Sequence, residues 1–137
     1  MNTAIERIIH GKTVVAIIVR ASFDDERQFV TSEDSPMQLG ARSYPKNHTV
    51  LAHHHADIER TITQNQEFLY ITSGVVKARF YLGNGQVGAT IVKTGDMILQ
   101  MCGGHSFEMI EASRIVMIKQ GPYIGEKEKV FIEIKEV

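Results

Sequence analysis

The sequence lacks the features that mark disulfide-rich, nucleic-acid-binding or membrane-spanning proteins. Its one cysteine, Cys102, excludes an intramolecular disulfide and a four-cysteine zinc site. The formal net charge is −1 and the basic residues are scattered, so nothing favours nucleic acid or an anionic membrane as a partner. The apolar run 14–19 is too short to span a bilayer, and no small-residue cleavage site follows it. We therefore expect a cytoplasmic protein with no membrane association.

The sequence does contain many short β-prone segments separated by turn residues. A chain of 137 residues suits one domain, 1–137, that can bury a core. Residues 1–11 are compatible with a helix or a strand, and 56–66 reads as a polar loop. Short strands with glycine turns, including the hairpin signal Gly83-Asn84-Gly85, and no convincing amphipathic helix predict an all-β sandwich or barrel. The predicted strands are 13–19, a short one around 28–30, 49–55, 67–72, 75–82, 87–93, 97–101, 105–110, 114–119 and 130–136.

Three consecutive histidines, His53-His54-His55, end the predicted strand 49–55. Side chains alternate along a strand, so His53 and His55 point one way and His54 the other. If Leu51 marks the interior face, both outer histidines of the triplet point inward. Two imidazoles on one face can bind a single metal ion, since neutral imidazole is the commonest metal ligand. The alternative is a polar strand end whose histidines meet water or a carbonyl group.

Two further residues offer the same chemistry on predicted strands. Glu67 shares a face with Leu69, so it is either a strand-end residue in water or a buried acid that needs a cation. His105 shares a face with Phe107 and Met109, which predicts an inward imidazole. For His105 the alternative is a hydrogen-bonded histidine of the core. The combination with His53 and His55 is what favours a metal.

The stretch 47–74 resembles the first motif of the cupin superfamily. Asn47 stands at the opening glycine position, the histidine triplet supplies His-x-His, and 67–74 has the spacing from glutamate to glycine. The gap between His55 and Glu67 is longer than in the family's pattern, which an enlarged loop explains. It leaves three other residues as candidates for the ligand position of Glu67: Gln64, Gln66 and Glu59.

The stretch 95–109 resembles the second cupin motif. Residues 95–100 open it, Met101 replaces the usual proline, and Gly103-Gly104 supply the turn. His105 arrives one residue early, and Met109 stands near the position of the final asparagine. Both motifs in order, with all the ligand types, make the chain similar to a small single-domain cupin.

The resemblance implies a jelly-roll β-barrel that binds a divalent transition metal, with Fe, Mn, Ni, Co and Zn all open. It also implies a homodimer. The function implied is a metal-dependent enzyme of the isomerase, epimerase or dioxygenase type, acting on a small polar metabolite or sugar derivative. The alternative is a binding or accessory module without catalysis, because fold alone does not choose. The metal ligands implied are His53, His55, Glu67 and His105.

Several other residues have more than one interpretation, and no catalytic acid or base stands out beyond the ligands. Cys102 is a ligand, a redox-sensitive neighbour of the site or a small core residue. The segment 119–123 either folds over the barrel mouth or forms a turn with an exposed aromatic ring. Tyr70 is expected to face away from the site. Four cationic side chains could bind substrate, although a solvated surface is the favoured interpretation: Arg79, Lys77, Arg42 and Lys46. Gln38 is a buried, hydrogen-bonded amide or a substrate ligand.

Overall fold

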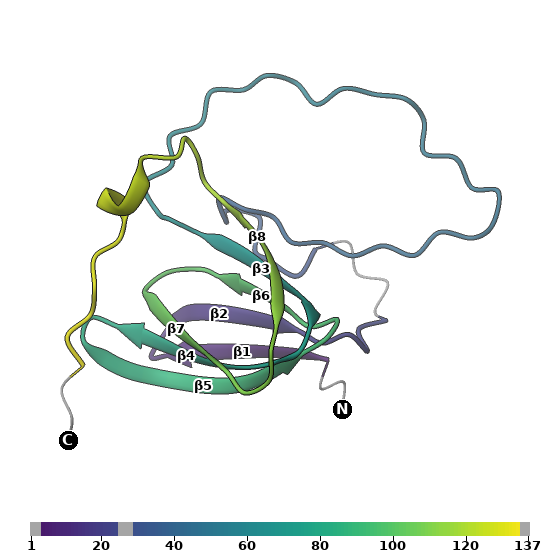
Figure 1. The fold of residues 1–137 in the computed structure, drawn as a ribbon. Helices are drawn as coiled ribbons and strands as arrows, with labels where there is room; N and C mark the ends of the chain where they lie inside the picture. Colours follow the sequence, from purple (N-terminus) through teal and green to yellow (C-terminus); the bar gives the residue numbers. More distant parts are fainter. Residues whose placement is uncertain (1–3, 25–28, 135–137) are drawn as a thin grey trace. The chain divides into compact units, whose positions relative to one another are not determined.

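The structure, a computed structural model, describes residues 4–24 and 29–134. The chain divides into two compact units, one formed by 1–23 with 64–137 and the other by 24–63, and each is described by itself. All strands of the described residues belong to the first unit (Figure 1). They are β1 (Ile5–His10), β2 (Thr13–Val19), β3 (Glu67–Ser73), β4 (Val75–Leu82), β5 (Gly85–Lys93), β6 (Met97–Gln100), β7 (Gly104–Met109) and β8 (Arg114–Lys119), followed by the 3-10 helix η1 (Gly125–Glu128).

The strands of the first unit form two antiparallel sheets. One has five strands in the order β1-β2-β6-β3-β8, and the other has three in the order β5-β4-β7. The five-stranded sheet therefore joins the N-terminal strand β2 to β6, more than seventy residues later in the chain. The prediction of an all-β fold is confirmed. In the part of the chain that the structure describes, neither sheet closes into a barrel.

The core of the first unit comes from both sheets. Val15 and Ile18 of β2, Leu69 of β3 and Ile98 of β6 are almost completely buried with Phe80 of β4. The β-branched residues of β2 suit this position, because they pack well on a pleated surface and restrict the backbone to extended conformations. Burying a side chain such as Phe80 contributes about 1.5–3 kcal/mol relative to leaving it in water.

Two turns fix where neighbouring strands begin. In the β4–β5 hairpin, Leu82 pairs with Gly85, and the positive φ of 57° falls on Gly83. The predicted hairpin turn is therefore confirmed. Its left-handed residue is Gly83, which precedes the Asn84-Gly85 pair, and a glycine in this first central position is typical of a type II′ hairpin. Asp96, before β6, accepts hydrogen bonds from the backbone N–H groups of Ala21 and Lys93, both at 2.9 Å.

The second unit has neither helix nor strand among its described residues, 24 and 29–63. The N–H of Val30 donates to the carbonyl of Leu39 at 2.7 Å, and the amide of Gln38 donates to three carbonyls inside the loop so closed. Gln38 is therefore a hydrogen-bonded amide, as one of the two interpretations has it, but it is exposed rather than buried. The expected turn at 45–47 is confirmed: His48 N–H donates to the Pro45 carbonyl, and Asn47 has a φ of 69°.

The predicted strand at 49–55 is wrong. Its residues belong to no sheet, and Leu51 is 80% exposed, so it does not mark an interior face. Alternation of apolar and polar residues makes a strand only where a neighbouring strand supplies hydrogen bonds. The same reason applies to 29–30 and 130–134, which are also outside any sheet; the remainders of those two predicted strands, 28 and 135–136, lie outside the described residues.

No helix in residues 4–24 and 29–134 is long and apolar enough to cross a membrane.

Candidate functional site

A cavity of about 450 Å³ opens in the first unit beside β3, β6, β7 and β8. This volume lies in the range of small-molecule sites. Alternation along the strands decides which side chains reach it. Glu67 and Leu69 of β3 line the cavity. Tyr70, which follows Leu69, does not line it and is 39% exposed, as expected. The inward face predicted for β7 is also confirmed, because its alternate residues His105, Phe107 and Met109 all line the cavity.

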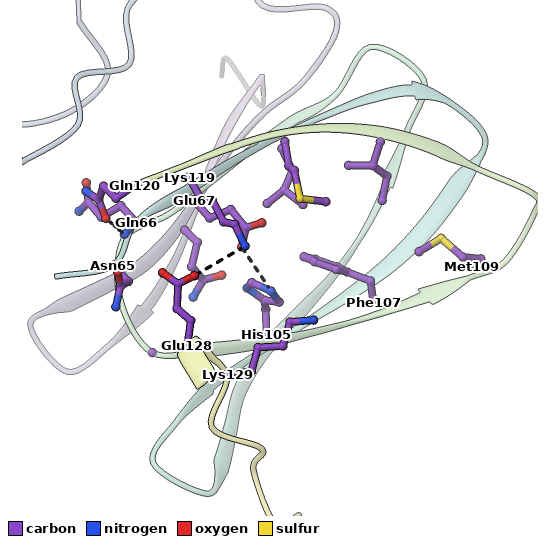
Figure 2. A pocket seen from close by; sticks show the side chains of 15 residues that line it. Asn65, Gln66, Glu67, His105, Phe107, Met109, Lys119, Gln120, Glu128 and Lys129 are labelled. Carbon is purple, nitrogen blue, oxygen red and sulfur yellow. Dashed lines mark hydrogen bonds and ion pairs between the residues drawn. The ribbon is translucent and has the colours of Figure 1, made fainter. Parts of the chain in front are cut away.

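Sheet register brings polar side chains together at one end of the cavity. Glu67 lies opposite Gln100 of β6 on one side and opposite Lys119 of β8 on the other. Residues opposite each other in antiparallel strands project to the same face, so these three side chains form a row across the five-stranded sheet. His105 comes from the other sheet and faces this row (Figure 2).

Glu67 and His105 meet across the cavity. His105 Nε2 lies 3.6 Å from Glu67 Oε2, which is longer than a hydrogen bond but within ion-pair range (Figure 2). The imidazole stacks on Phe107, with ring centroids 4.6 Å apart. Burial lowers the pKa of His105 below its ordinary value, and the negative charge of Glu67 opposes part of this effect. The imidazole is therefore neutral at neutral pH, the form that binds metals.

Three buried side-chain atoms have no hydrogen-bond partner within residues 4–24 and 29–134: Gln100 Oε1, His105 Nδ1 and Gln120 Nε2. All three belong to residues that line this one cavity. A buried polar atom without a partner costs about 1–3 kcal/mol. Such atoms are rare in native proteins, and their concentration here is typical of a binding site.

The C-terminal part of the chain completes the wall. Lys119 Nζ lies 3.8 Å from Glu128 Oε2, so a side chain of η1 pairs with one of β8 (Figure 2). Lys119 and Gln120 line the cavity, whereas Tyr123 is 76% exposed, which agrees with the second interpretation of 119–123, a turn with an exposed aromatic ring. The sequence did not single out Gln100, Glu128 or Lys129. For the last two the available signal was the alternating Glu-Lys run after Gly125.

Of the four predicted metal ligands, the first unit contains Glu67 and His105, and the second contains His53 and His55. The rings of His53 and His55 have centroids 5.2 Å apart. His53 Nδ1–H donates to the Leu51 carbonyl at 2.7 Å, which leaves Nε2 as the nitrogen with a free lone pair. Metal-binding histidines commonly hold their other nitrogen in this way. The imidazole and carboxylate donors thus fit a transition metal chemically.

No group of three or more His, Cys, Asp or Glu side chains in the described ranges, 4–24 and 29–134, is arranged to hold a metal ion. The four-ligand site therefore stays a prediction. Gln66, one alternative to Glu67, is buried and donates through Nε2 to the Met101 carbonyl at 3.2 Å. Glu67 is the residue of this group that directly faces His105.

The remaining candidates have structural roles where the structure describes their contacts. Arg79 pairs with Glu108 at 2.7 Å, and neither lines the cavity. The Cys102 thiol lies 3.7 Å from the Val14 carbonyl, and burial raises its pKa, as expected of a small, partly buried core residue. Arg42 lies over the Tyr44 ring within the second unit, with its guanidinium carbon 6.0 Å from the ring centroid.

Comparisons with protein-family models, curated proteins and solved structures give no match for this chain.

Proposed function

We propose that the protein is a cupin-like jelly-roll protein that binds a small polar molecule in the cavity beside β3, β6, β7 and β8, with a divalent transition metal at Glu67 and His105. The meeting of these two side chains carries the proposal. Donors about 2.0–2.2 Å from one ion lie roughly 3–3.6 Å from each other. The distance of 3.6 Å between His105 Nε2 and Glu67 Oε2 fits this separation.

The resemblance also implies His53 and His55, which belong to the second unit, as ligands. Their support is the His-x-His spacing and the free Nε2 of His53. A set of imidazoles with one carboxylate suits Fe, Mn, Ni, Co or Zn, and affinity order alone does not choose among them. When bound, such an ion supplies Lewis-acid polarisation of a substrate oxygen.

The chain's own groups would position the substrate and move protons. Lys119 and Glu128 are titratable residues at the same cavity as the Glu67–His105 pair. In an isomerase, epimerase or dioxygenase acting on a small polar metabolite, they are the groups available for proton transfer. Their pairing with each other at 3.8 Å favours a second candidate, a module that binds the molecule without turnover, because both side chains are already engaged in a contact within the cavity wall.

Metal content after purification tests the metal part of the proposal. We expect about one divalent ion per chain in the wild type and a loss in Glu67→Gln and His105→Ala. Glu108→Gln is the matched control, since Glu108 is on β7 but outside the cavity. His53→Ala and His55→Ala should lower the metal content, whereas His54→Ala should not. A wild type that holds no more metal than His105→Ala would contradict the metal proposal.

Turnover separates the two candidates once a ligand is known. In an enzyme, Lys119→Gln should lower kcat while the ligand still binds. In a binding module no substrate is consumed by the wild type.

We also propose a cytoplasmic homodimer. The unpaired Cys102 supports a reducing compartment. The terminal strands β7 and β8 of the two sheets support assembly, because a strand at a sheet end presents backbone groups that can pair with a second chain. Sedimentation velocity should give the mass of two chains; a single species with the mass of one chain would contradict the dimer.

A further inference from the structure

The cavity has a polar end and an apolar end. The row of Gln100, Glu67 and Lys119 defines the polar end, and the apolar wall continues along the same strands with Leu69, Met117 and Ile115. Figure 2 shows the labelled amides Gln66 and Gln120 on one side of the cavity and Met109 on the other, with Phe107 between. A ligand that fills this space needs an apolar body attached to a polar head.

The amide of Gln100 presents a hydrogen-bond acceptor. Its Nε2 donates to the Cys102 carbonyl at 2.5 Å and lies 3.5 Å from the Gly104 carbonyl. The reversed amide would place Oε1 against these carbonyl oxygens, so the backbone fixes its orientation. The side chain is 2% exposed, and its Oε1 has no partner among the described residues. A ligand that satisfies it must donate a hydrogen bond, as a hydroxyl group does.

The amide of Gln120 presents the opposite group. Its Oε1 accepts from the backbone N–H of Gln66 at 2.8 Å, which leaves Nε2 as the donor without a partner in the described chain. The ammonium of Lys119 belongs to the same cavity wall. A ligand carboxylate satisfies the Gln120 donor through a charge-assisted hydrogen bond, and it shares the Lys119 ammonium with Glu128, whose Oε2 lies 3.8 Å from Nζ.

We infer that the cavity selects a hydroxy carboxylic acid with an apolar body, rather than a sugar or sugar phosphate. This rests on the proposed function, because it assigns a ligand class to the same cavity. The hydroxyl group donates to Gln100, the carboxylate accepts from Gln120 and Lys119, and the body covers the wall at Met109 and Met117. Those methionines are 49% and 55% exposed, so an apolar ligand removes surface from water. The several hydroxyl groups of a sugar would lose water there without gaining partners.

Calorimetry or ligand-observed NMR on the full chain, with a fixed excess of Mn²⁺, tests the inference with matched probes. Phenyllactate carries the hydroxyl, the carboxylate and an apolar body. Lactate lacks the body, phenylpropionate lacks the hydroxyl, and gluconate and a hexose phosphate lack the apolar part. We expect phenyllactate to bind at least about fivefold more tightly than each of the others, from burial of the ring and from the hydrogen bond to Gln100.

Met117→Gln and Ile118→Gln are matched variants for the apolar wall. Both residues lie on β8 with exposures of 55% and 56%, but only Met117 lines the cavity. Met117→Gln should weaken phenyllactate about fivefold and leave lactate unchanged, whereas Ile118→Gln should change neither.

Two results overturn the inference and are distinguishable. If gluconate or the hexose phosphate binds more tightly than phenyllactate, and Glu67→Gln removes that binding, the ligand class is wrong while the proposed function stands. If no probe binds and the wild type holds no metal, the cavity is not a binding site and both fail.

Discussion

His105 is subject to two opposite influences, burial that favours the neutral imidazole and a carboxylate that favours the charged one. Burial is the larger, so the folded-state pKa is below the ordinary 6.5. The unfolded chain therefore binds more protons than the folded chain as the pH falls below that value, and stability decreases. Above it the imidazole is neutral in both states and contributes no pH dependence.

We expect His105→Gln to flatten the pH dependence of the unfolding free energy between the ordinary histidine pKa and the lower folded-state pKa. Urea unfolding at a series of pH values, with a chelator present to keep metal from the imidazole, measures this. His54→Gln is the control, because His54 is exposed in the second unit. A wild type that grows more stable as the pH falls through this window, relative to His105→Gln, would show that Glu67 outweighs burial.

Substitutions at two glycines with left-handed backbone distinguish the cost of backbone strain from the cost of a steric clash. Gly83 has a φ of 57° with no atom within 4 Å of an added Cβ, whereas at Gly103, with a φ of 72°, a Cβ would meet the Tyr81 carbonyl and the Leu82 side chain. Gly83→Ala should cost only the left-handed strain, about 1–2 kcal/mol. Gly103→Ala should cost more, because backbone of β4 must also move. Denaturant unfolding of both variants checks the order; equal losses would mean that the loop before His105 relaxes freely.

At the scale of strands, Asp96 connects the end of β2, the end of β5 and the start of β6. It is 2% exposed and accepts from two backbone N–H groups and from Arg20 at 3.2 Å. Arg20 also pairs with Glu6 of β1 at 2.6 Å. The Asp96 carboxylate thereby accepts hydrogen bonds from donors that the regular hydrogen bonds between strands do not satisfy.

We expect Asp96→Ala to destabilise the fold by about 3 kcal/mol, since it leaves buried donors and a partly buried cation without their acceptor. Glu6→Ala removes the more exposed partner of the same arginine and should cost less than about 1 kcal/mol. Thermal and urea unfolding of the two variants test the difference. Similar costs would show that the ion pair, rather than the backbone bonds, matters at Asp96.

The strands that the sequence predicted well are those with their own β-branched or apolar residues and clear turns. Residues 13–19 and 114–119 have the predicted bounds in β2 and β8. The predictions at 49–55 and 130–134 failed because alternation says nothing about whether a partner strand is present. Pairing is a property of the assembled sheet, and single-segment patterns do not contain it.

The candidate site also contains some residues that the sequence predicted and others that it did not. Face alternation found Glu67 and His105, because each lies in a correctly predicted strand beside apolar residues of the same face. Gln100 was not found as a ligand contact, and Gln120 was included only as part of the segment 119–123, because an amide has a ligand role only when its backbone partners fix it and leave one atom free. Glu128 lies in a 3-10 helix that follows an irregular stretch, and the alternating Glu-Lys run that contains it does not show that its side chain faces a cavity.

At the scale of the whole chain, the first unit contains a complete core. The buried cluster consists of residues from β1, β2, β3, β4, β5 and β6, all in the two segments 1–23 and 64–137. Two of the predicted metal ligands, His53 and His55, are in the other unit, within a stretch without regular structure. Folding of the sheets and binding of metal can therefore be tested separately in one variant.

Replacing residues 40–61 by a Gly/Ser linker of about twelve residues should leave the two sheets folded, because none of the core cluster is removed. The closure entropy of a loop changes by only about 0.6 kcal/mol per doubling of its length, so the melting temperature should stay within about 5 °C. The metal content is nevertheless expected to fall, although Glu67 and His105 are retained, because His53 and His55 are two of the four predicted ligands. Circular dichroism and metal analysis of one preparation measure both quantities. Loss of the β-sheet spectrum would mean that 40–61 is needed for folding, and an unchanged metal content in a folded variant would exclude His53 and His55 as ligands.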